Sequence, residues 1–468
     1  MEDTGRIPNH LHGRILMQTL DASALEQQQA LYRNALSVFV KQRLLTQAAA
    51  DAILPLIGLP NTDIMNLLTP YDRALNAGII TQEQLVSMRQ EITRQIHNPA
   101  AKCSGTAAHL YSGAASASDC TLSTETRNEN VVKSVSGGNV TLKRVQIEKY
   151  GDTKNHIEGN FTGLNAAVLS EGGRISISDS QIVSHAIGGN NVFAHGADSY
   201  ITLKNVLLDA YGAASNRCIY VSFGGHVDAD HCELISRGSI SSPVATDIGG
   251  GTIRLSSCVV TALGNHCAAL YSTGRIEARH CICVAPETEG IIIVGSNSIF
   301  LQSSHVFSGQ NQGVKFASEL GESQGEFTME GGSLTVAEGP LFLVERDARI
   351  TLKNAAIAVP SNQLLTLYQG FSPPGMEQPE PGQSVIQMEL AQQKLSGAIQ
   401  SDSAHTLELH LKDGSLLTGS ITAPDSTVTL SHNSRWILTG NSTIGTLINE
   451  DSAGENIILN GFSLVCSH

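Results

Sequence analysis

Four side chains of this 468-residue sequence are candidates for acid–base chemistry: His195, Arg217, Asp247 and His266. Histidine titrates near neutral pH, so His195 or His266 is suited to moving protons. Asp247 is suited to orienting a substrate or abstracting a proton, and Arg217 to stabilising a developing negative charge. Such a set predicts a metal-free isomerisation, cyclisation or elimination that needs no cofactor.

Apolar side chains recur close to these polar residues. Phe193 and Tyr220 are expected to shape a substrate pocket, which Leu270 and Ile293 extend. If the chain stacks in register, they belong to one outward-facing column, namely Val168, Phe193, Tyr220, Ala245, Leu270 and Ile293. An apolar column with a polar rim has the composition of a small-molecule site. The expected cover of this column is the N-terminal helices, the segment 370–384, a second subunit or a ligand.

One repeated pattern must position these residues. It reads apolar, variable, apolar, two turn-like residues, small, variable, apolar, and its copies start 23 to 28 residues apart at Ile201, Val227, Ile253, Ile276, Ile299, Phe327 and Ile350. Earlier copies start at Val140 and Ile175. A period in the twenties with alternation inside it is typical of stacked β coils, and the leucine-rich repeat frame is absent. The sequence therefore predicts an all-β, right-handed parallel β-helix.

Four regions follow from changes in this pattern. They are an α-helical capping or dimerisation domain (1–100), the parallel β-helix (101–369), a Pro-rich loop (370–384) and C-terminal coils (385–468). In the first region Thr46 is a predicted helix cap, and Pro55 is expected to interrupt the helix that follows. Thr81 and Gln84 are spaced as a capping box. This region predicts either a cap for the open end of the stack or a homodimer contact through its helices.

Alignment of the repeats also predicts two columns in which side chains of successive coils stack on one another. The small inward position collects Val145, Ser180, Val206, Cys232, Cys258, Cys281, Ser304, Gly332 and Ala355, and its three successive cysteines are interpreted as buried packing rather than as a redox site. An outward ladder alternates in charge from Asp228 through Arg254 to Glu277, and Lys204 faces Asp230. Charge pairing is favoured over a metal site made of His226, Asp228, Asp230 and His231.

The amino-acid composition restricts the classes of partner that the protein is expected to bind. The formal net charge is −14 and no basic stripe exists, so nucleic acid is not an expected ligand. No run approaches the ~20 apolar residues of a membrane span, so no membrane partner is expected. The nine cysteines without a CxxC pair, and the lack of an apolar stretch in residues 1–12, predict a cytoplasmic protein. A cell-surface location is the alternative if a leader has been removed.

A family resemblance rests on five segments: GLNAAVLSEGG (163–173), GGGTIRLSSCVV (249–260), HCAALYSTGRI (266–276), FTMEGGSLTVAEGPLFLV (327–344) and SRWILTGNSTIGTL (434–447). Over about 137–466 the chain resembles the bacterial adhesin-like right-handed parallel β-helix proteins, which are pectate-lyase-like solenoids. The resemblance implies the fold and a surface or adhesion role without catalytic residues. The chain differs in its helical N-terminal region and in carrying Cys, His, Tyr and Phe where that family tends to have Thr, Ser, Asn and Asp.

Two functions of different classes remain. The first is an intracellular enzyme of the isomerase, cyclase or lyase type, which acts on a small, partly apolar organic substrate in a lateral groove. The alternative is a non-catalytic, adhesin-like solenoid that binds extended glycans or a protein partner. The carboxylate cluster of a pectate-lyase-like Ca²⁺ site and the Asp-Asp pair of a galacturonase-like site are absent, which leaves Asp247 and Glu289 as a weaker glycosidase pair.

Overall fold

The computed structural model describes residues 101–467 except 154–155, 214–215, 318–323, 346, 368–383 and 402–404, together with 33, 36–41, 43, 45–57, 73–75, 77–81 and 84–85. The expected Pro-rich loop at 370–384 therefore lies outside the described residues except at its last position. The chain divides into two compact units, of which the second begins at Pro99. Each unit is considered by itself.

The N-terminal unit contains the helix α3 (Gln47–Ile57). Its predicted cap is confirmed, because the Ala49 amide donates to Thr46 Oγ1 at 3.2 Å. The expected interruption at Pro55 is wrong, since α3 continues through this residue to Ile57. The capping box is confirmed by two reciprocal bonds: Thr81 N–H donates to Gln84 Oε1 at 2.9 Å, and Gln84 N–H donates to Thr81 Oγ1 at 3.2 Å.

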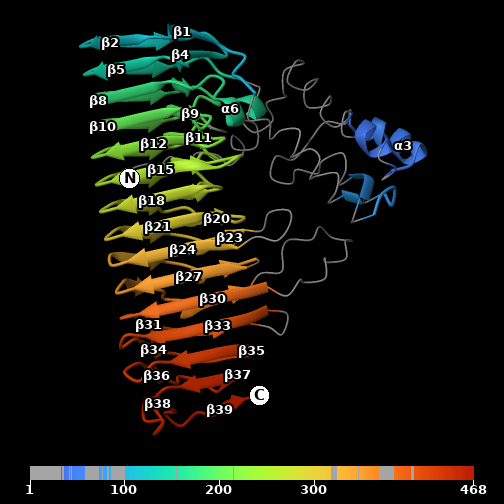
Figure 1. The fold of residues 1–468 in the computed structure, drawn as a ribbon, viewed down its shortest axis with the longest axis vertical. Coiled ribbons are helices and arrows are strands. Elements are labelled where there is room, and N and C mark those ends of the chain that lie inside the picture. The colour runs from blue at the N-terminus through green and yellow to red at the C-terminus, as the bar shows by residue number, and fades with distance from the viewer. Residues whose placement is uncertain are drawn as a thin grey trace, which may run out of the picture. The chain divides into compact units, whose positions relative to one another are not determined.

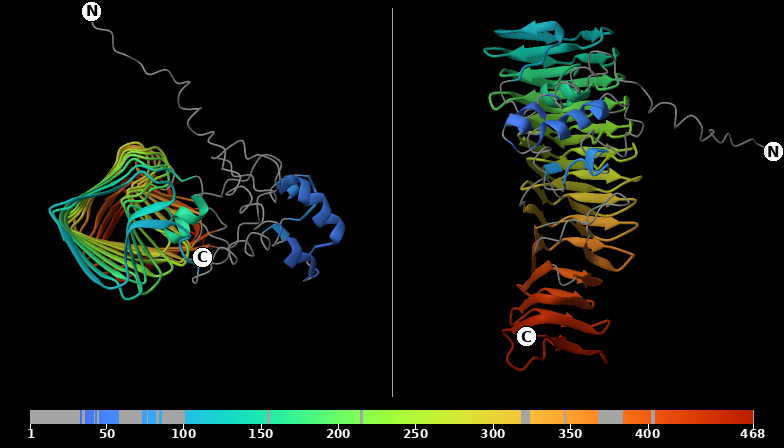
Figure 2. Two further views of the ribbon diagram at one scale, coloured as in Figure 1. Left: turned by 90° about the horizontal axis from the view of Figure 1, so that it is seen from above. Right: turned by 90° about the vertical axis from the view of Figure 1, so that its right-hand side faces the viewer.

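The second unit is a parallel β-solenoid, as the repeat predicts (Figure 1). Each coil contributes a strand to each of three parallel sheets, named I, II and III in the order in which a coil visits them. Seen down the axis, successive coils superimpose, and helix α6 (His156–Thr162) lies outside the ring of strands (Figure 2). Every coil therefore places equivalent residues one above another, ~4.8 Å apart.

Sheet I carries the face on which the sequence places the candidate site. Its strands are β1 (Thr106–Tyr111), β4 (Glu129–Val135), β7 (Val168–Glu171), β9 (Val192–His195), β11 (Ile219–Ser222), β14 (Val244–Thr246), β17 (Leu270–Ser272), β20 (Ile291–Val294), β23 (Val314–Ala317), β26 (Phe342–Val344), β29 (Gln363–Leu367), β32 (Ala398–Gln400), the first parts of β35 (Ile421–Leu430) and β37 (Ser442–Asn449), and β39 (Leu464–Cys466).

Sheet II contains the strands that begin the repeat. They are β2 (Ala114–Ser118), β5 (Asn139–Lys143), the first parts of β8 (Arg174–Ser184) and β10 (Tyr200–Ala210), β12 (Gly225–Asp230), β15 (Gly251–Ser256), β18 (Arg275–Arg279), β21 (Ser298–Gln302), β24 (Gly325–Glu330), β27 (Ala348–Lys353), β30 (Ser384–Ala391), β33 (His405–Lys412) and the second parts of β35 and β37.

Sheet III completes each coil. It comprises β3 (Thr121–Thr124), β6 (Gln146–Lys149), the second parts of β8 and β10, β13 (Glu233–Ser236), β16 (Val259–Ala262), β19 (Ile282–Ala285), β22 (His305–Ser308), β25 (Ser333–Val336) and β28 (Ala356–Ala358). In the C-terminal coils, β31 (Lys394–Ser396), β34 (Leu416–Thr418), β36 (Arg435–Ile437) and β38 (Ile457–Ile458) pair with one another.

The corner between sheets II and III has the same backbone conformation in most coils. One residue there has φ between 48° and 56°, although it is not glycine: Asp119, Arg144, Asp179, Asn205, His231, Ser257, His280, Ser303, Asn354, Gln392 and Asp413. A single left-handed residue turns the chain sharply, and Asn and Asp tolerate this conformation best. The corner thus fixes where one strand ends and the next begins.

The small inward column follows this corner, as predicted, and its side chains have a role beyond packing. Ser180 Oγ accepts from the Val145 N–H above it at 3.0 Å, Cys281 Sγ from Cys258 N–H at 3.5 Å, and Ser304 Oγ from Cys281 N–H at 3.1 Å. The column therefore satisfies buried amides at the corner. All the cysteines are free thiols, which agrees with the interpretation of the three cysteines in this column as buried packing.

The outward charge ladder on sheet II also has the predicted register. Arg254 Nη1 lies 3.8 Å from Asp228 Oδ1, and Arg254 Nε lies 3.9 Å from Glu277 Oε1. Asp230 stands opposite Lys204 but is bonded by His231 Nδ1 at 2.8 Å. Among the described residues, no group of three or more His, Cys, Asp or Glu side chains is arranged to hold a metal ion.

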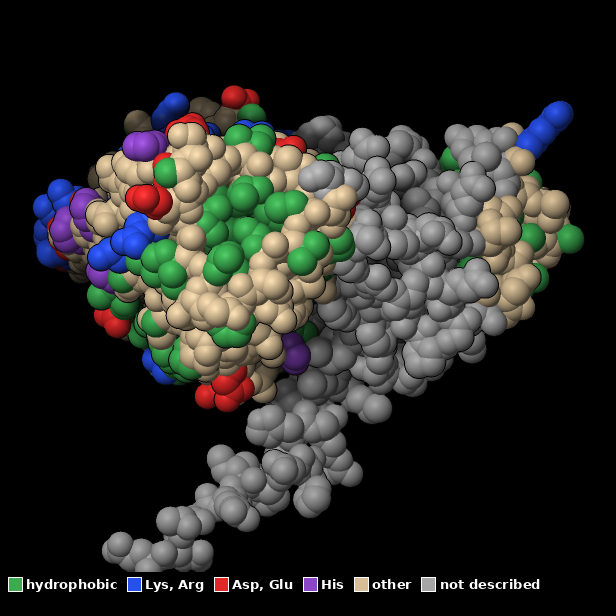
Figure 3. Space-filling view, turned by 90° about the horizontal axis from the view of Figure 1, so that it is seen from below, with side chains coloured by type: hydrophobic (Ala, Val, Ile, Leu, Met, Phe, Trp, Pro, Cys, Tyr) green, Lys and Arg blue, Asp and Glu red, His purple; other side chains and the backbone are tan. Residues whose placement is uncertain are grey.

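The last coil leaves apolar side chains in solvent. Viewed from the C-terminal end, hydrophobic side chains gather over this face (Figure 3), and the exposed apolar residues of the last coils are Ile448, Leu459, Phe462 and Val465. The same coils bury Trp436 completely. The interior is therefore well filled in the C-terminal coils that the structure describes.

One cation is enclosed near the first coils. Lys149, at the end of β6, is fully buried, and its Nζ donates to the Thr126 carbonyl oxygen at 2.7 Å. Burial lowers the pKa of Lys149 to about 8, with Glu129 acting in the opposite direction. Because the folded protein binds this proton less tightly than the unfolded chain, its charge costs stability below pH 8, and that cost disappears as the pH rises towards 10.5.

We expect Lys149→Met to raise the free energy of unfolding at pH 7 by about 1–2 kcal/mol, after the lost bond to Thr126 is offset against the removed charge. The gain should shrink between pH 8 and 10, because the wild-type lysine then becomes neutral. Thermal unfolding followed by circular dichroism at pH 7 and 9.5 measures both effects. The exposed Lys204→Met is the matched control, and a pH-independent gain would contradict the explanation.

Candidate functional site

The outward face of sheet I has a different register from the one expected. Phe193, Tyr220 and Ala245 do lie in one column. Below them the column continues through Tyr271 and Ile292, because Ala245 pairs with Tyr271 and Tyr271 with Ile292. The placement of Leu270 and Ile293 in this column is wrong, as is that of Val168, since all three point into the interior core. A shift of one residue moves a side chain to the opposite face of a strand.

The upper part of this column is covered by the solenoid's own chain. Cys103, Leu164 and Ala166 pack with Leu169, Phe193, Tyr220 and Ala245 in one buried cluster, against which Tyr271 is partly buried. The cover is the segment 101–104 and the turn after α6, and Figure 1 shows α6 beside β9 and β11. Phe193 and Tyr220 meet edge to face with their centroids 4.9 Å apart. These rings therefore form a closed core rather than an open groove.

Polar side chains of sheet I hold the covering segment in place. Glu171 Oε1 accepts from the Cys103 N–H at 2.7 Å, and Lys133 Nζ donates to the Cys103 carbonyl oxygen at 3.4 Å. The two side chains also form an ion pair of 3.2 Å, and both are buried. Below them, Glu158 Oε1 accepts from the Ser104 N–H at 2.6 Å. Such charge-assisted bonds are stronger than neutral ones, so the segment 101–104 is firmly attached.

His195 lies one coil below Glu171 in the same outward column, and both of its ring nitrogens have hydrogen-bond partners in the protein. Its Nε2 lies 2.8 Å from the Ala101 carbonyl oxygen, and its Nδ1 lies 3.0 Å from Ser222 Oγ. Because a carbonyl oxygen only accepts, we assign the proton of the neutral ring to Nε2. The side chain is 1% exposed, and burial lowers the pKa of His195, although the bond to Ala101 acts in the opposite direction.

Ser222 and His195 have the geometry of a nucleophile and its base. The single proton of the Ser222 hydroxyl has two acceptors in reach, His195 Nδ1 at 3.0 Å and the Phe161 carbonyl oxygen at 2.8 Å, and Ser222 is fully buried. Neither residue is open to a substrate in this conformation. Their bonds instead join β9 and β11 to the segment 101–104 and to α6.

A second polar group surrounds the ring of Tyr220. The guanidinium carbon of Arg217 lies 4.3 Å from the ring centroid, and the Tyr220 hydroxyl donates to Asp247. Arg217 Nη1 also donates to Asn160 Oδ1 at 2.9 Å. Burial, followed by the charge of Asp247, raises the pKa of Tyr220 well above its usual value, while Arg217 acts in the opposite direction. A neutral phenol is therefore held between a cation and a carboxylate.

The structure thus brings Arg217, Tyr220 and Asp247 together, and it places Phe193 and His195 on the neighbouring strand. His266 is separate from them: it is exposed and occupies a left-handed turn, with φ of 57°, before β17. Asp247 follows the end of its strand and His266 precedes the start of the next. The five proposed acid–base and ring residues other than His266 therefore share one face, on which Phe193, His195 and Tyr220 are buried and Arg217 and Asp247 are half-buried.

Sequence reasoning missed the residues that close this face. Lys133, Glu171, Cys103 and Asn130 were not singled out, although Asn130 Nδ2 donates to the carbonyl oxygens of Gly163 and Ala166 at 3.0 and 2.9 Å. One signal was available for Glu171, which lies one coil above His195 in the same column. A charged residue beside a histidine on an otherwise apolar strand indicates a buried partner.

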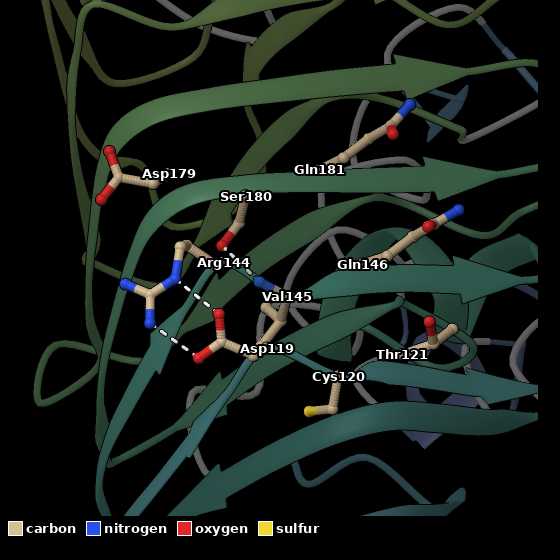
Figure 4. A pocket seen from close by; sticks show the side chains of 9 residues that line it. All are labelled: Asp119, Cys120, Thr121, Arg144, Val145, Gln146, Asp179, Ser180 and Gln181. Atoms are coloured by element: carbon tan, nitrogen blue, oxygen red, sulfur yellow. Dashed lines mark hydrogen bonds and ion pairs between the residues drawn. The ribbon is translucent and has the colours of Figure 1, made fainter.

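A pocket does exist at the II–III corner of the first coils. It has a volume of about 400 Å³ and is lined by Asp119, Cys120, Thr121, Arg144, Val145, Gln146, Asp179, Ser180 and Gln181 (Figure 4). Arg144 donates from Nε and Nη2 to the two oxygens of Asp119 at 2.6 Å each, and this bond lowers the pKa of Asp119 to about 2. None of the predicted site residues lines this pocket, and its central charges neutralise each other.

Comparison with known protein families and with curated proteins finds no match to this chain. Among the helices that the structure describes, none has the length and apolar character needed to cross a membrane.

We expect His195→Gln to lower the melting temperature at pH 7.5, because the bonds to Ala101 and Ser222 are weakened, at a cost of about 1–3 kcal/mol. The buried imidazole has a lowered pKa, so its contribution is complete above pH 6.5 and is lost as the pH falls below it. The difference between wild type and variant should therefore narrow from pH 7.5 to 5.

Thermal melts across this pH range, with the exposed His266→Gln as the matched control, measure the effect. A difference that stays constant down to pH 5 would show that His195 contributes nothing to the pH dependence of folding.

Proposed function

We propose that this solenoid is a non-catalytic binding scaffold for a protein partner, which it contacts through an apolar surface on sheet III. The observation that carries the proposal is a group of exposed apolar side chains on adjacent coils. They are Val259 on β16, Leu263 directly after it, Ile282 on β19 and Phe307 on β22, with exposed fractions of 38%, 40%, 47% and 37%. We call these four residues the lateral patch.

The register makes the lateral patch continuous. Val259 pairs with Ile282 on the next coil, and Val284, two residues after Ile282, pairs with Phe307. The half-buried Val284 lies between Ile282 and Phe307, and the half-buried Ile235 lies on the coil above Val259. Single exposed apolar residues are ordinary, but a contiguous group on a flat, rigid sheet is typical of an interaction surface.

The character of the surface favours a protein over a glycan. A sugar ring packs on the open face of an aromatic ring, but Phe307 is the single aromatic residue of the lateral patch, and the exposed tyrosines that follow β6 and β10 are stacked on a histidine. Tyr150 and Tyr211 both stack on His185, with centroids 5.0 and 4.8 Å away, and Arg237 lies over Tyr211. Aliphatic side chains such as Val259 and Ile282 instead suit the apolar core of a protein interface.

The state of the predicted catalytic residues supports the same choice. Of these, His195 is buried and bonds to the protein itself, and the predicted substrate-binding residues Phe193 and Tyr220 are buried beside it. The resemblance to bacterial adhesin-like β-helix proteins, which implies a binding role, agrees with this reading. For the enzyme hypothesis, a substrate reaches these residues only if the segment 101–104, which is bonded by Lys133 and Glu171, is displaced.

A photocrosslinking amino acid placed at position 282 tests the proposal in cells that produce the protein. The protein recovered in the adduct is then purified, and its affinity for the solenoid is measured by titration. We expect a discrete protein adduct, and binding of that partner should weaken by roughly 30-fold in Ile282→Glu, as for a charge placed in a hot spot. Position 356 on β28 is the matched control, because Ala356 lies exposed in the same column three coils away.

Three outcomes would contradict the proposal. They are the absence of any adduct specific to position 282, unchanged affinity in Ile282→Glu, and an adduct consisting only of a second copy of this chain. The last result would assign the lateral patch to self-association, and sedimentation analysis of Ile282→Glu would then show a monomer.

A further inference from the structure

Three arginines on sheet II form a cluster that is separate from the lateral patch and from the buried face of sheet I. Arg254 lies on β15, and Arg275 and Arg279 lie on the next strand, β18, both labelled in Figure 1. In the register, Arg254 stands opposite Glu277, which is flanked on β18 by the other two arginines. We call Arg254, Arg275 and Arg279 the arginine cluster.

One carboxylate organises all three guanidinium groups. Glu277 Oε1 is 2.8 Å from Arg275 Nε and 3.9 Å from Arg254 Nε, and Glu277 Oε2 is 3.6 Å from Arg279 Nη2. The Glu277 side chain is only 11% exposed, whereas those of Arg254, Arg275 and Arg279 are 53%, 62% and 47% exposed. The carboxylate therefore lies beneath a ring of cations that face solvent.

Further contacts limit the freedom of two of the arginines. The guanidinium carbon of Arg279 lies 5.1 Å from the centroid of the Phe300 ring, and its Nη1 donates to Gln302. Arg254 Nη1 lies 3.2 Å from His226 Nε2. Because these side chains are held before any ligand arrives, less conformational entropy is lost when they bind one.

The charges in the cluster do not cancel. Three guanidinium groups face Glu277 and, on the coil above, Asp228, which lies 3.8 Å from Arg254 and also bonds His226 and the Tyr200 hydroxyl. The other carboxylate of that coil, Asp230, is bonded by His231 and stands opposite Lys204. The coil below presents Ser298, Phe300 and Gln302, which carry no charge. A positive excess remains at this point of a chain whose formal net charge is −14.

We propose that the arginine cluster is a binding site for a phosphate- or sulfate-bearing ligand. Guanidinium groups match the oxygens of such anions with paired N–H donors. Of the donors of Arg275, only Nε is engaged within the described part of the chain, by Glu277, so its two Nη groups remain for a ligand. An ordinary charge ladder pairs one cation with one carboxylate, as Arg144 does with Asp119, and it leaves no such excess.

Isothermal titration at low ionic strength tests the site with two probes, inorganic pyrophosphate and dextran sulfate, and with neutral dextran as a blank. The double variant Arg275→Gln/Arg279→Gln should weaken binding by at least ~10-fold, the effect of losing one charge-assisted hydrogen bond or more. The matched control is Arg144→Gln at the II–III corner, which should bind as wild type does. Added salt should weaken binding in each protein that binds.

Both probes present anionic oxygens of the same kind, but they stand for different classes of ligand. Binding of pyrophosphate indicates a small phosphorylated ligand, and binding of dextran sulfate alone indicates a sulfated polymer; either result supports the site if the double variant loses it. The site is disproved if neither probe binds, or if the double variant binds as tightly as wild type. The double variant Arg275→Lys/Arg279→Lys keeps the charge but not the paired donors, so it should bind with intermediate affinity. It also provides a second test of the site if the glutamine variant does not fold.

Discussion

The solenoid depends on the stacking of identical positions, and the left-handed residue at the II–III corner is what keeps that stacking in register. Asp179 and Asn205 turn two successive coils with φ of 53° each, and Asn205 Nδ2 donates to Asp179 Oδ1 at 3.1 Å. Where the inward residue after the corner is Ser180, Cys281 or Ser304, its side chain accepts a hydrogen bond from the amide above it. Backbone conformation, amide satisfaction and side-chain register are therefore fixed together at one edge of each coil.

Much of this architecture is visible in the sequence because it repeats. The column from Val145 to Ala355, the charge ladder around Arg254 and the capping box at Thr81 all follow from spacing and residue type. The hydrogen-bonding role of the inward Ser and Cys side chains was not predicted, because size alone explains why they fit. Local propensity predicts an interruption at Pro55, but packing, which buries Ile53 and Ile57 on either side of this residue, outweighs it.

The candidate site was predictable only in part, and the failures have physical causes. Leu270 and Tyr271 are both large and apolar, so hydrophobic pattern cannot decide which of them faces outward, and a length difference between coils shifts the register. The cover over Phe193 and Tyr220 comes from residues 101–104, which precede the repeat and carry no periodic signal. The polar residues around His195 are explained by attachment of that segment, which a list of reactive residue types does not reveal.

The three sheets therefore differ in what they present. Sheet I is closed over aromatic and charged side chains in its upper coils, sheet II carries ordered charges, and sheet III exposes the apolar lateral patch. A parallel β-solenoid permits this division because outward positions do not contribute to its core. The stability of the stack and the chemistry of each face are for this reason largely independent.

The distribution of thiols has a practical consequence. Seven of the nine cysteines are buried, and they lie on several different coils, while Cys466 on β39 is exposed. A thiol-reactive reagent reaches an enclosed sulfur only when its own coil separates from the neighbours, but it reaches Cys466 immediately. The order in which the sulfurs become alkylated therefore records the order in which the coils come apart, with the last coil as an internal reference.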